Sequence, residues 1–132
     1  MVTEQANHRI LIWSTFPTVS GTPADIVLGQ AGMTTATPAT GASGLAGPYK
    51  ATSNGTQLFA ADSGNNRVLV WNSFPTEIAT PADVVLGQST FAGASAGTAV
   101  DRFSTPSGVH AADNRLFVSD YGNSRVLIYA GQ

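Results

Sequence analysis

Residues 65–88 read NNRVLVWNSFPTEIATPADVVLGQ, and residues 7–30 read NHRILIWSTFPTVSGTPADIVLGQ. The two stretches align without a gap at an offset of 58 residues (67 − 9 = 58 for the shared arginines), and more than half of the aligned positions are identical. A third copy begins at residue 123 with NSRVLIY, at the same offset. A fixed spacing of this size is typical of repeat arrays, in which each unit buries its faces against a neighbour.

The apolar residues of one repeat come in short runs. Val, Leu, Ile and aromatic residues in runs bounded by Gly, Asn, Asp and Pro favour strands, and each run is too short for a helix of about 10–12 residues. Four short antiparallel strands in a row are typical of a propeller blade. The expected strands are 48–53 and 106–112, 57–62 and 115–120, 67–71 with its counterparts 9–13 and 125–129, and 82–88 with its counterpart 24–30.

The composition limits the possible partners. Charged residues make up 11% of the chain, with six Lys and Arg against eight Asp and Glu, and Lys50 is the only lysine. A nucleic-acid-binding surface needs clustered basic residues, so we expect no nucleic-acid partner. No apolar run approaches the roughly 20 residues of a membrane-spanning helix, so we expect no membrane partner. The chain has no cysteine, which excludes disulfides, thiolate nucleophiles and Cys-ligated metals.

The stretches LFAADSGNNRVLVW (58–71) and LFVSDYGNSRVLIY (116–129) resemble the strand–turn–strand core of NHL repeats, whose propellers usually have six blades. The stretch PSGVHAADNRLFVSD (106–120) is similar to the strand and turn that precede this core. The first copy departs from the pattern, because Glu4 and Ala6 replace the Asp and the Gly, and we expect no strand before it. The resemblance implies a non-catalytic module that binds proteins, RNA or glycans through loops.

The repeat divides the chain into a single array of about two blades. A complete blade is expected at 48–88, and partial blades are expected at 1–30 and 106–132. Linkers rich in Thr, Ala and Gly occupy 31–47 and 89–105. Because two blades cannot close a ring and would leave strand edges unpaired, we expect a homo-oligomer. In that model three chains supply six blades, and strand 24–30 of one chain completes the partial blade 106–132 of the next.

The turn DSGNNR (62–67) reverses the chain between two strands. We expect Gly64 to adopt a positive φ and Asn65 to tolerate one. Asp62 and Asn65 can bind local backbone N–H groups, and Arg67 can hold a carboxylate or carbonyl oxygens with its planar guanidinium. Asp120 and Arg125 repeat this pattern. The alternative is that the turns contact a ligand or partner through Ser63, Gly64, Asn65, Asn66, Tyr121, Gly122, Asn123 and Ser124.

Large aromatic residues recur at fixed repeat positions. Trp13, Trp71 and Tyr129 share one position, and Phe16 and Phe74 share another. We expect these rings to pack between blades; an aromatic cage for a sugar or a cation is the alternative.

Few polar residues are candidates for chemistry. We expect Asp25 and Asp83 to cap a turn or face solvent, and His8 to be exposed in a turn. His110 falls on the predicted innermost strand, where copies from several chains would converge near a channel. It is the one candidate metal ligand, although no second ligand lies at a suitable spacing; the other interpretation, which we favour, is a histidine that is satisfied between blades.

No catalytic motif is present: the chain lacks a G-x-S-x-G elbow, a P-loop and an H-E-x-x-H pair. We therefore expect no catalytic residue and no cofactor. The leading hypothesis is a binding or scaffold module whose partners are its own copies and a protein, glycan or small ligand. A fragment of a lyase- or lactonase-like propeller enzyme, or a self-assembling fragment without a ligand, stays open as an alternative.

Overall fold

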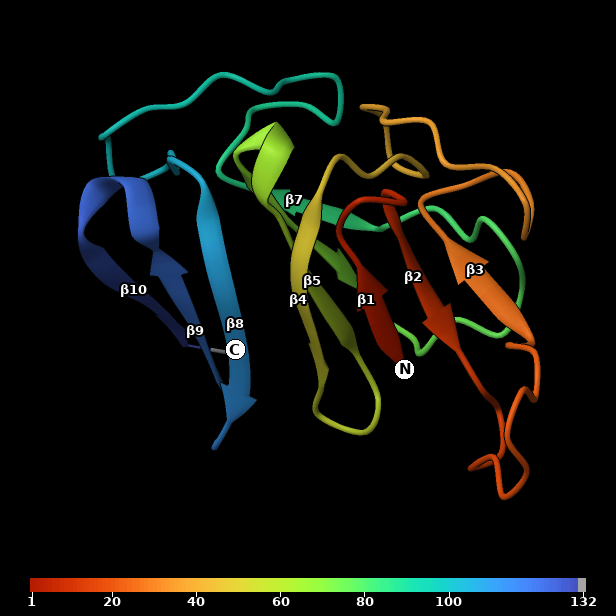
Figure 1. The fold of residues 1–132 in the computed structure, drawn as a ribbon. Coiled ribbons are helices and arrows are strands. Elements are labelled where there is room, and N and C mark those ends of the chain that lie inside the picture. Colours follow the sequence, from red (N-terminus) through yellow and green to blue (C-terminus); the bar gives the residue numbers. More distant parts are fainter. Residues whose placement is uncertain (131–132) are drawn as a thin grey trace.

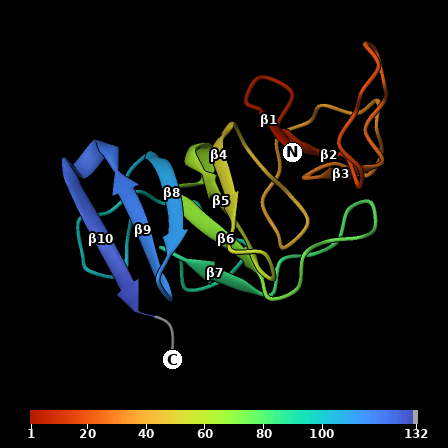
Figure 2. The same cartoon turned by 90° about the horizontal axis from the view of Figure 1, so that it is seen from below.

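The structure, a computed structural model, describes residues 1–130 and consists of three antiparallel sheets that lie side by side in chain order (Figures 1 and 2). The all-β fold class expected from the sequence is confirmed. Apart from the strands, the described elements are two single-turn 3₁₀ helices, η1 (Ser63–Asn65) and η2 (Tyr121–Asn123). Within residues 1–130, no helix is long and apolar enough to cross a membrane.

The central sheet has four strands in chain order. They are β4 (Pro48–Ser53), β5 (Leu58–Asp62), β6 (Arg67–Trp71) and β7 (Val84–Leu86). These strands coincide with the four expected between residues 48 and 88, because turn residues bound each apolar run.

The C-terminal sheet repeats the first three of these strands. Its strands are β8 (Pro106–Ala112), β9 (Arg115–Asp120) and β10 (Arg125–Ala130). Residues 131 and 132, which the expected partial blade 106–132 includes, lie outside the described residues. In both sheets the first strand has a register irregularity after its initial proline.

The N-terminal sheet has one strand more than the sequence predicts. It contains β1 (Val2–Glu4), β2 (Arg9–Ile12) and β3 (Ile26–Leu28), in that order. The expectation that no strand precedes 9–13 is therefore wrong. The segment pairs in register, with Val2 opposite Leu11 and Glu4 opposite Arg9. Its residues differ from those of β5, so the strand was not recognisable from the repeat.

The two faces of the central sheet are both buried. Successive residues of a strand point to opposite faces, so Leu69 and Trp71 of β6 face the N-terminal sheet, whereas Val68 and Val70 face the C-terminal sheet. All five residues of β6 are buried. Full burial of one such aliphatic side chain contributes about 1.5–3 kcal/mol, so each sheet depends on its neighbours for stability.

Two hydrophobic cores fill the spaces between the sheets. The first, between the N-terminal and central sheets, contains Ile10, Ile12, Ile26, Leu28, Leu45, Leu58, Ala60, Leu69, Trp71 and Ala82. The second, between the central and C-terminal sheets, contains Phe59, Ala61, Val68, Val70, Phe103, Val109, Leu116 and Val118.

The outer face of the C-terminal sheet is exposed and apolar. Val126 and Ile128 are 61% and 59% exposed, although their counterparts on β6, Val68 and Val70, are buried. Ile128 is paired with Phe117 across the sheet. This face is therefore the equivalent of the central-sheet face that packs on a neighbouring sheet.

The outer face of the N-terminal sheet corresponds to the other face of the central sheet. Leu11 and Trp13 are only half-buried there, whereas their counterparts Leu69 and Trp71 are buried in the first core. The two ends of the row thus present two different faces of the same repeat.

The expectation that Phe16 and Phe74 pack between sheets is wrong. Phe16 is 92% exposed and Phe74 is 37% exposed. Their strands end at Ile12 and Trp71, so both rings lie in loops beyond the layer in which the sheets face one another.

Candidate functional site

The turn after β5 is built around the carboxylate of Asp62. This group accepts hydrogen bonds from the Ala46 backbone N–H at 2.7 Å, from Asn65 Nδ2 at 2.8 Å and from Arg67 Nε at 2.7 Å. The first of these donors belongs to the preceding linker, 16 residues away. Asp62 therefore anchors the linker as well as the turn. The expected binding of local backbone N–H groups is replaced by a bond from the distant Ala46, and Asn65 acts as a donor.

Arg67 connects two linkers to the central sheet. Its side chain is 0% exposed. One terminal nitrogen, Nη2, donates to the carbonyl oxygens of Gly41 at 2.9 Å and Gly44 at 3.0 Å, and the other, Nη1, donates to the carbonyl oxygen of Phe91. The planar guanidinium suits this work because it offers five N–H donors in fixed directions.

The same ion pair occurs once in each sheet. Arg125 Nε lies 2.8 Å from Asp120, and Arg9 pairs with Glu4. The side chains of Arg125 and Arg9 are 27% and 17% exposed, unlike that of Arg67. Glu4 therefore takes over the role of the Asp that the first copy lacks.

The surroundings of Asp62 and of Glu4 shift the pKa of these two carboxylates in opposite directions. Burial raises the pKa of Asp62, against the opposing effects of the Ala46 amide, Asn65 and Arg67. The hydrogen bond from Arg9 lowers the pKa of Glu4, which is more exposed. The Asp62 carboxylate therefore depends on its three donors to stay ionised within the core.

The backbone of the turn differs from the expectation. The positive φ belongs to Asn66, at 51°, and neither Gly64 nor Asn65 has one. Gly64 is required for a different reason, since a Cβ there would lie 2.5 Å from the Ala46 carbonyl oxygen. That carbonyl accepts the Gly64 N–H at 2.8 Å. Gly122 makes the same close approach to Ser104.

The side chains of the first candidate loop are used inside the protein. Ser63 donates to the Pro106 carbonyl oxygen, Asn65 donates to the Ala39 carbonyl oxygen at 2.9 Å, and Asn66 donates to the Ala94 carbonyl oxygen at 2.9 Å. These groups hold neighbouring segments in place.

The second candidate loop is more accessible. Tyr121 is 73% exposed, and Gly122 and Ser124 are exposed as well. Asn123 donates to the Gly97 carbonyl oxygen at 2.8 Å and to Asp120. Of the two loops, 121–124 is therefore the one that presents a large side chain to solvent.

The repeated tryptophans have different surroundings. Trp71 is 2% exposed in the first core, and its Nε1 donates to the Thr80 carbonyl oxygen at 2.9 Å. Trp13 makes the same bond with the carbonyl oxygen of Thr22, at 3.0 Å, but it is half-buried. Trp71 packs between sheets, and Trp13 lies on an outer face.

The two histidines lie apart in the fold. His8 is half-buried rather than exposed, and its Nδ1 accepts the Gly47 N–H at 2.9 Å. His110 lies on β8, exposed on the outer side of the C-terminal sheet, with its ring 6.3 Å from that of Phe117. Among the described residues, no three His, Asp or Glu side chains are grouped so that they could hold a metal ion.

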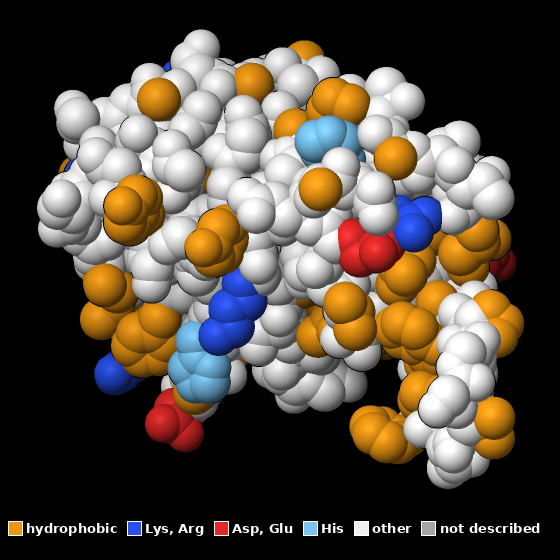
Figure 3. Space-filling view, viewed as in Figure 1, with side chains coloured by type: hydrophobic (Ala, Val, Ile, Leu, Met, Phe, Trp, Pro, Cys, Tyr) orange, Lys and Arg blue, Asp and Glu red, His pale blue; other side chains and the backbone are white. Residues whose placement is uncertain are grey.

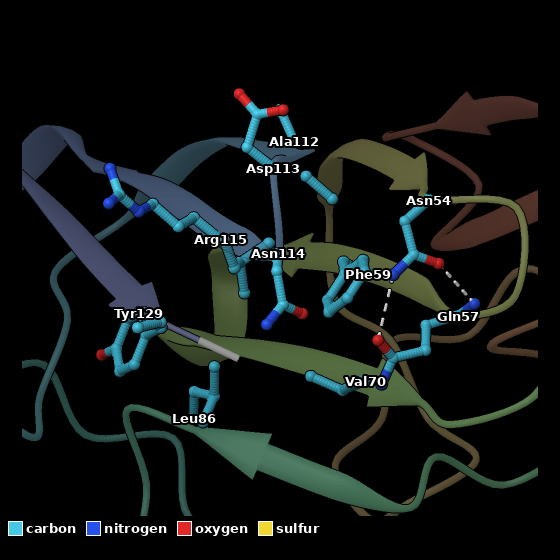
Figure 4. A pocket seen from close by; sticks show the side chains of 13 residues that line it. Asn54, Gln57, Phe59, Val70, Leu86, Ala112, Asp113, Asn114, Arg115 and Tyr129 are labelled. Carbon is cyan, nitrogen blue, oxygen red and sulfur yellow. Dashed lines mark hydrogen bonds between the residues drawn. The ribbon is translucent and has the colours of Figure 1, made fainter. Parts of the chain in front are cut away.

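A cavity of about 310 Å³ opens between the central and C-terminal sheets (Figure 4). Phe59, Val70, Leu86 and Tyr129 form its apolar part, and burial raises the pKa of Tyr129. Amide side chains line the hairpin ends beside it. The sequence did not indicate this cavity.

One repeated side chain has the role that the sequence predicts, and a second has a role that was not predicted from the sequence. Asp83 accepts the Asn72 backbone N–H at 2.7 Å, and Gln88 Nε2 donates to the Asn66 carbonyl oxygen at 3.0 Å. The expected turn-capping role of the Asp is therefore present. The Gln has an identical counterpart in the first copy, and this identity was the available signal.

The face of the molecule seen in Figure 3 carries few charged side chains, which are scattered among uncharged polar and apolar ones. Comparison with models of known protein families and with characterised proteins found no match.

Proposed function

We propose that the chain is a non-catalytic binding or scaffold module of the NHL-repeat propeller type. Its sheets stand beside those of other copies in a ring, and the loops of the ring bind a protein, glycan or small ligand. One observation above all supports this proposal: the central sheet is covered on both faces by sheets of its own kind. Within residues 1–130, a sheet at either end of the row packs on one such neighbour (Figure 1).

The two outer faces of the row correspond to the two faces of the central sheet, which pack on neighbouring sheets. The C-terminal sheet exposes Val126 and Ile128, whose counterparts on β6 are buried against the next sheet. The N-terminal sheet exposes the side of Leu11 and Trp13, whose counterparts are buried against the preceding sheet. Placing the C-terminal sheet of one copy on the N-terminal sheet of another repeats a contact that the chain already makes twice. Such head-to-tail contacts close into a ring when the rotation permits.

The number of strands bears on the number of chains. Three chains give six blades only if the N-terminal and C-terminal sheets of neighbouring chains merge into one blade, which requires β3 to leave β2. The pairing of β2 with both β1 and β3 opposes this exchange. Two chains give six sheets with every sheet as it stands, so two chains are the favoured ring and three the alternative.

The loop 121–124 is the favoured ligand-contacting segment. Tyr121 offers an apolar ring with a hydroxyl at its tip, and its neighbours in the loop are uncharged. With only six Lys and Arg in the chain, this surface suits a peptide or glycan better than a nucleic acid.

The test of assembly is sedimentation velocity on the wild type and on a Val126→Asp, Ile128→Asp double variant. Charges on the outer face would have to be buried in the contact, so we expect the double variant to sediment as a monomer. Val100→Asp is the matched control, since Val100 is 84% exposed in a linker, and it should behave as the wild type does. A wild-type chain that sediments as a compact, stable monomer at micromolar concentration would refute the proposal.

A further inference from the structure

The outer edge of β10 has no neighbouring strand among residues 1–130. β10 ends the C-terminal sheet, with β9 as its partner. In the other two sheets the equivalent strands, β2 and β6, carry β3 and β7 on that side. An unpaired strand edge is a template for another extended segment.

The strands that occupy this side share one sequence pattern, PADIVLGQ at 23–30 and PADVVLGQ at 81–88. In the central sheet the Asp83 carboxylate accepts the Asn72 N–H at 2.7 Å. The Asp83 N–H in turn donates to the Val70 carbonyl oxygen at 2.9 Å. The aspartate thus fixes the strand to the end of β6 with two bonds.

The N-terminal sheet repeats both bonds. The Asp25 carboxylate accepts the Ser14 N–H at 2.7 Å, and the Asp25 N–H donates to the Ile12 carbonyl oxygen at 3.0 Å. Recognition of the aspartate is therefore a property of the repeat, independent of the residue that supplies the N–H.

The terminal glutamine fixes the other end of the strand. Gln88 Nε2 donates to the Asn66 carbonyl oxygen at 3.0 Å, and Gln30 Nε2 donates to the His8 carbonyl oxygen at 2.9 Å. Both acceptors belong to the turn residue with a positive φ, 51° in each case. The acceptor is a backbone group, so it does not depend on the side chain at that position.

β10 offers the same groups. Ala130 and Ile128 hold the positions of Asn72 and Val70, and the alternation of an antiparallel ladder directs their N–H and C=O groups away from β9. Ser124 has a φ of 52°, so its carbonyl group lies in the same left-handed turn as the acceptors of the two glutamines.

The cavity lies where the C-terminal sheet lacks a loop like the one that precedes Asp83 in the central sheet. In the central sheet Trp71 is 2% exposed beneath this loop, with its Nε1 bonded to Thr80. The counterpart of Trp71 is Tyr129, which lines the cavity of about 310 Å³ together with Leu86 (Figure 4). An incoming loop of this kind would cover Tyr129 and fill the apolar part of the cavity.

We propose that the edge of β10 is a binding site for an extended peptide segment that carries an aspartate, three aliphatic residues and a Gly-Gln end. The peptide adds a fourth strand to the C-terminal sheet, and its preceding loop closes the cavity. The inference rests on the proposed repeat architecture. It does not depend on ring closure, which uses the faces of the sheets whereas the peptide uses an edge.

The experiment measures fluorescence anisotropy of a labelled synthetic peptide of residues 78–90 (IATPADVVLGQST) while the full chain is titrated in. We expect saturable binding of one peptide per chain. A peptide in which Asp83 is replaced by Ala should bind about tenfold more weakly, because it loses the bond to the strand end. A scrambled peptide of the same composition should not bind.

The matched protein variants are Ile128→Pro and Ile128→Val. Proline removes the N–H that faces the open edge and is tolerated on edge strands, so binding should be lost while circular dichroism shows a folded chain. Valine is the residue of the central sheet at this position, Val70, and it should bind as the wild type does. If Ile128→Pro fails to fold, the Asp83→Ala peptide alone decides.

The outcomes separate this inference from the proposed ring. No saturable binding, or equal binding of the native and scrambled peptides, would overturn the inference even if the chain forms rings. Specific binding to a monomeric chain would support the inference and refute the ring. If copies of the chain occupy the edge themselves, the unlabelled peptide should lower the sedimenting mass, which again supports strand addition at β10.

Discussion

Replacement of Arg67 by Met tests how much the fold depends on its buried ion pair. Both Arg67 and Asp62 have side chains that are 0% exposed. Removing one partner of such a pair leaves a buried charge without compensation, which costs about 3–5 kcal/mol. The carbonyl oxygens of Gly41, Gly44 and Phe91 also lose their donor. Uptake of a proton by Asp62, whose pKa burial already raises, limits the cost.

The matched control is Arg125→Met. Arg125 makes the same kind of contacts, with Asp120 and with three carbonyl oxygens, but its side chain is 27% exposed. Water can replace part of the hydrogen bonding that Arg125 provides, so we expect the free energy of unfolding to fall by about 1–3 kcal/mol. Since domains are stable by about 5–15 kcal/mol, Arg67→Met should remove roughly a fifth or more of the free energy of unfolding, and Arg125→Met should remove less.

The assay is equilibrium unfolding in urea, followed by tryptophan fluorescence at one fixed protein concentration and analysed by linear extrapolation. Trp71 is buried at the other end of β6, the strand that begins at Arg67, and its fluorescence should report the loss of the core. If Arg67→Met proves too unstable to purify, Arg67→Lys can replace it, because lysine retains the charge without the planar group. Its loss of free energy of unfolding should lie between the losses for Arg67→Met and Arg125→Met. A loss at Arg67 no larger than that at Arg125 would refute the reasoning.

Three further predictions concern the turn, the core and pH. Gly64→Ala should destabilise the chain by about 2 kcal/mol or more, because its Cβ would meet a backbone oxygen at 2.5 Å, whereas Gly32→Ala, in open space, should change the urea midpoint little. Trp71→Ala should cost about 3–5 kcal/mol, and Trp13→Ala should cost clearly less because Trp13 is half-buried; equal losses in urea would count against the two-core description. The pKa of Glu4 is lowered, chiefly by the hydrogen bond from Arg9, so its stabilising effect is present above its unfolded pKa and is lost as pH falls through the folded pKa. The urea midpoints of wild type and Glu4→Gln should therefore differ at pH 7 and converge once the pH lies below the folded pKa of Glu4.

The sequence predicted the strands of the central sheet because each is a short apolar run with turn residues on both sides. It could not predict β1, since Val2 and Thr3 have little in common with the residues of β5. Repeat identity was also a poor guide to burial: Phe16 and Phe74 match, yet both lie beyond the packed layer.

The candidate site shows a different limit. The identity of Asp62 and Arg67 pointed to an ion pair, but the carbonyl groups that Arg67 binds lie in linkers whose sequences differ. The sequence predicts a positive φ at Gly64, whereas the constraint on this residue in the structure is its close contact with Ala46, which is distant in sequence. The cavity lies where the C-terminal sheet has Tyr129 in place of the larger Trp71. In the other two sheets, the loop before β3 or β7 covers this place. The cavity can therefore be recognised only when the sheets are compared in the folded structure.

The molar mass of the wild-type chain in solution tests the central claim most directly, because the claim is that a sheet of this repeat needs a like sheet on each face. One chain has a mass of 13.5 kDa. Light scattering at micromolar concentration should give about 27 kDa, twice that value. A value of 13.5 kDa from a stably folded chain, with Val126 and Ile128 left in water, would contradict the account.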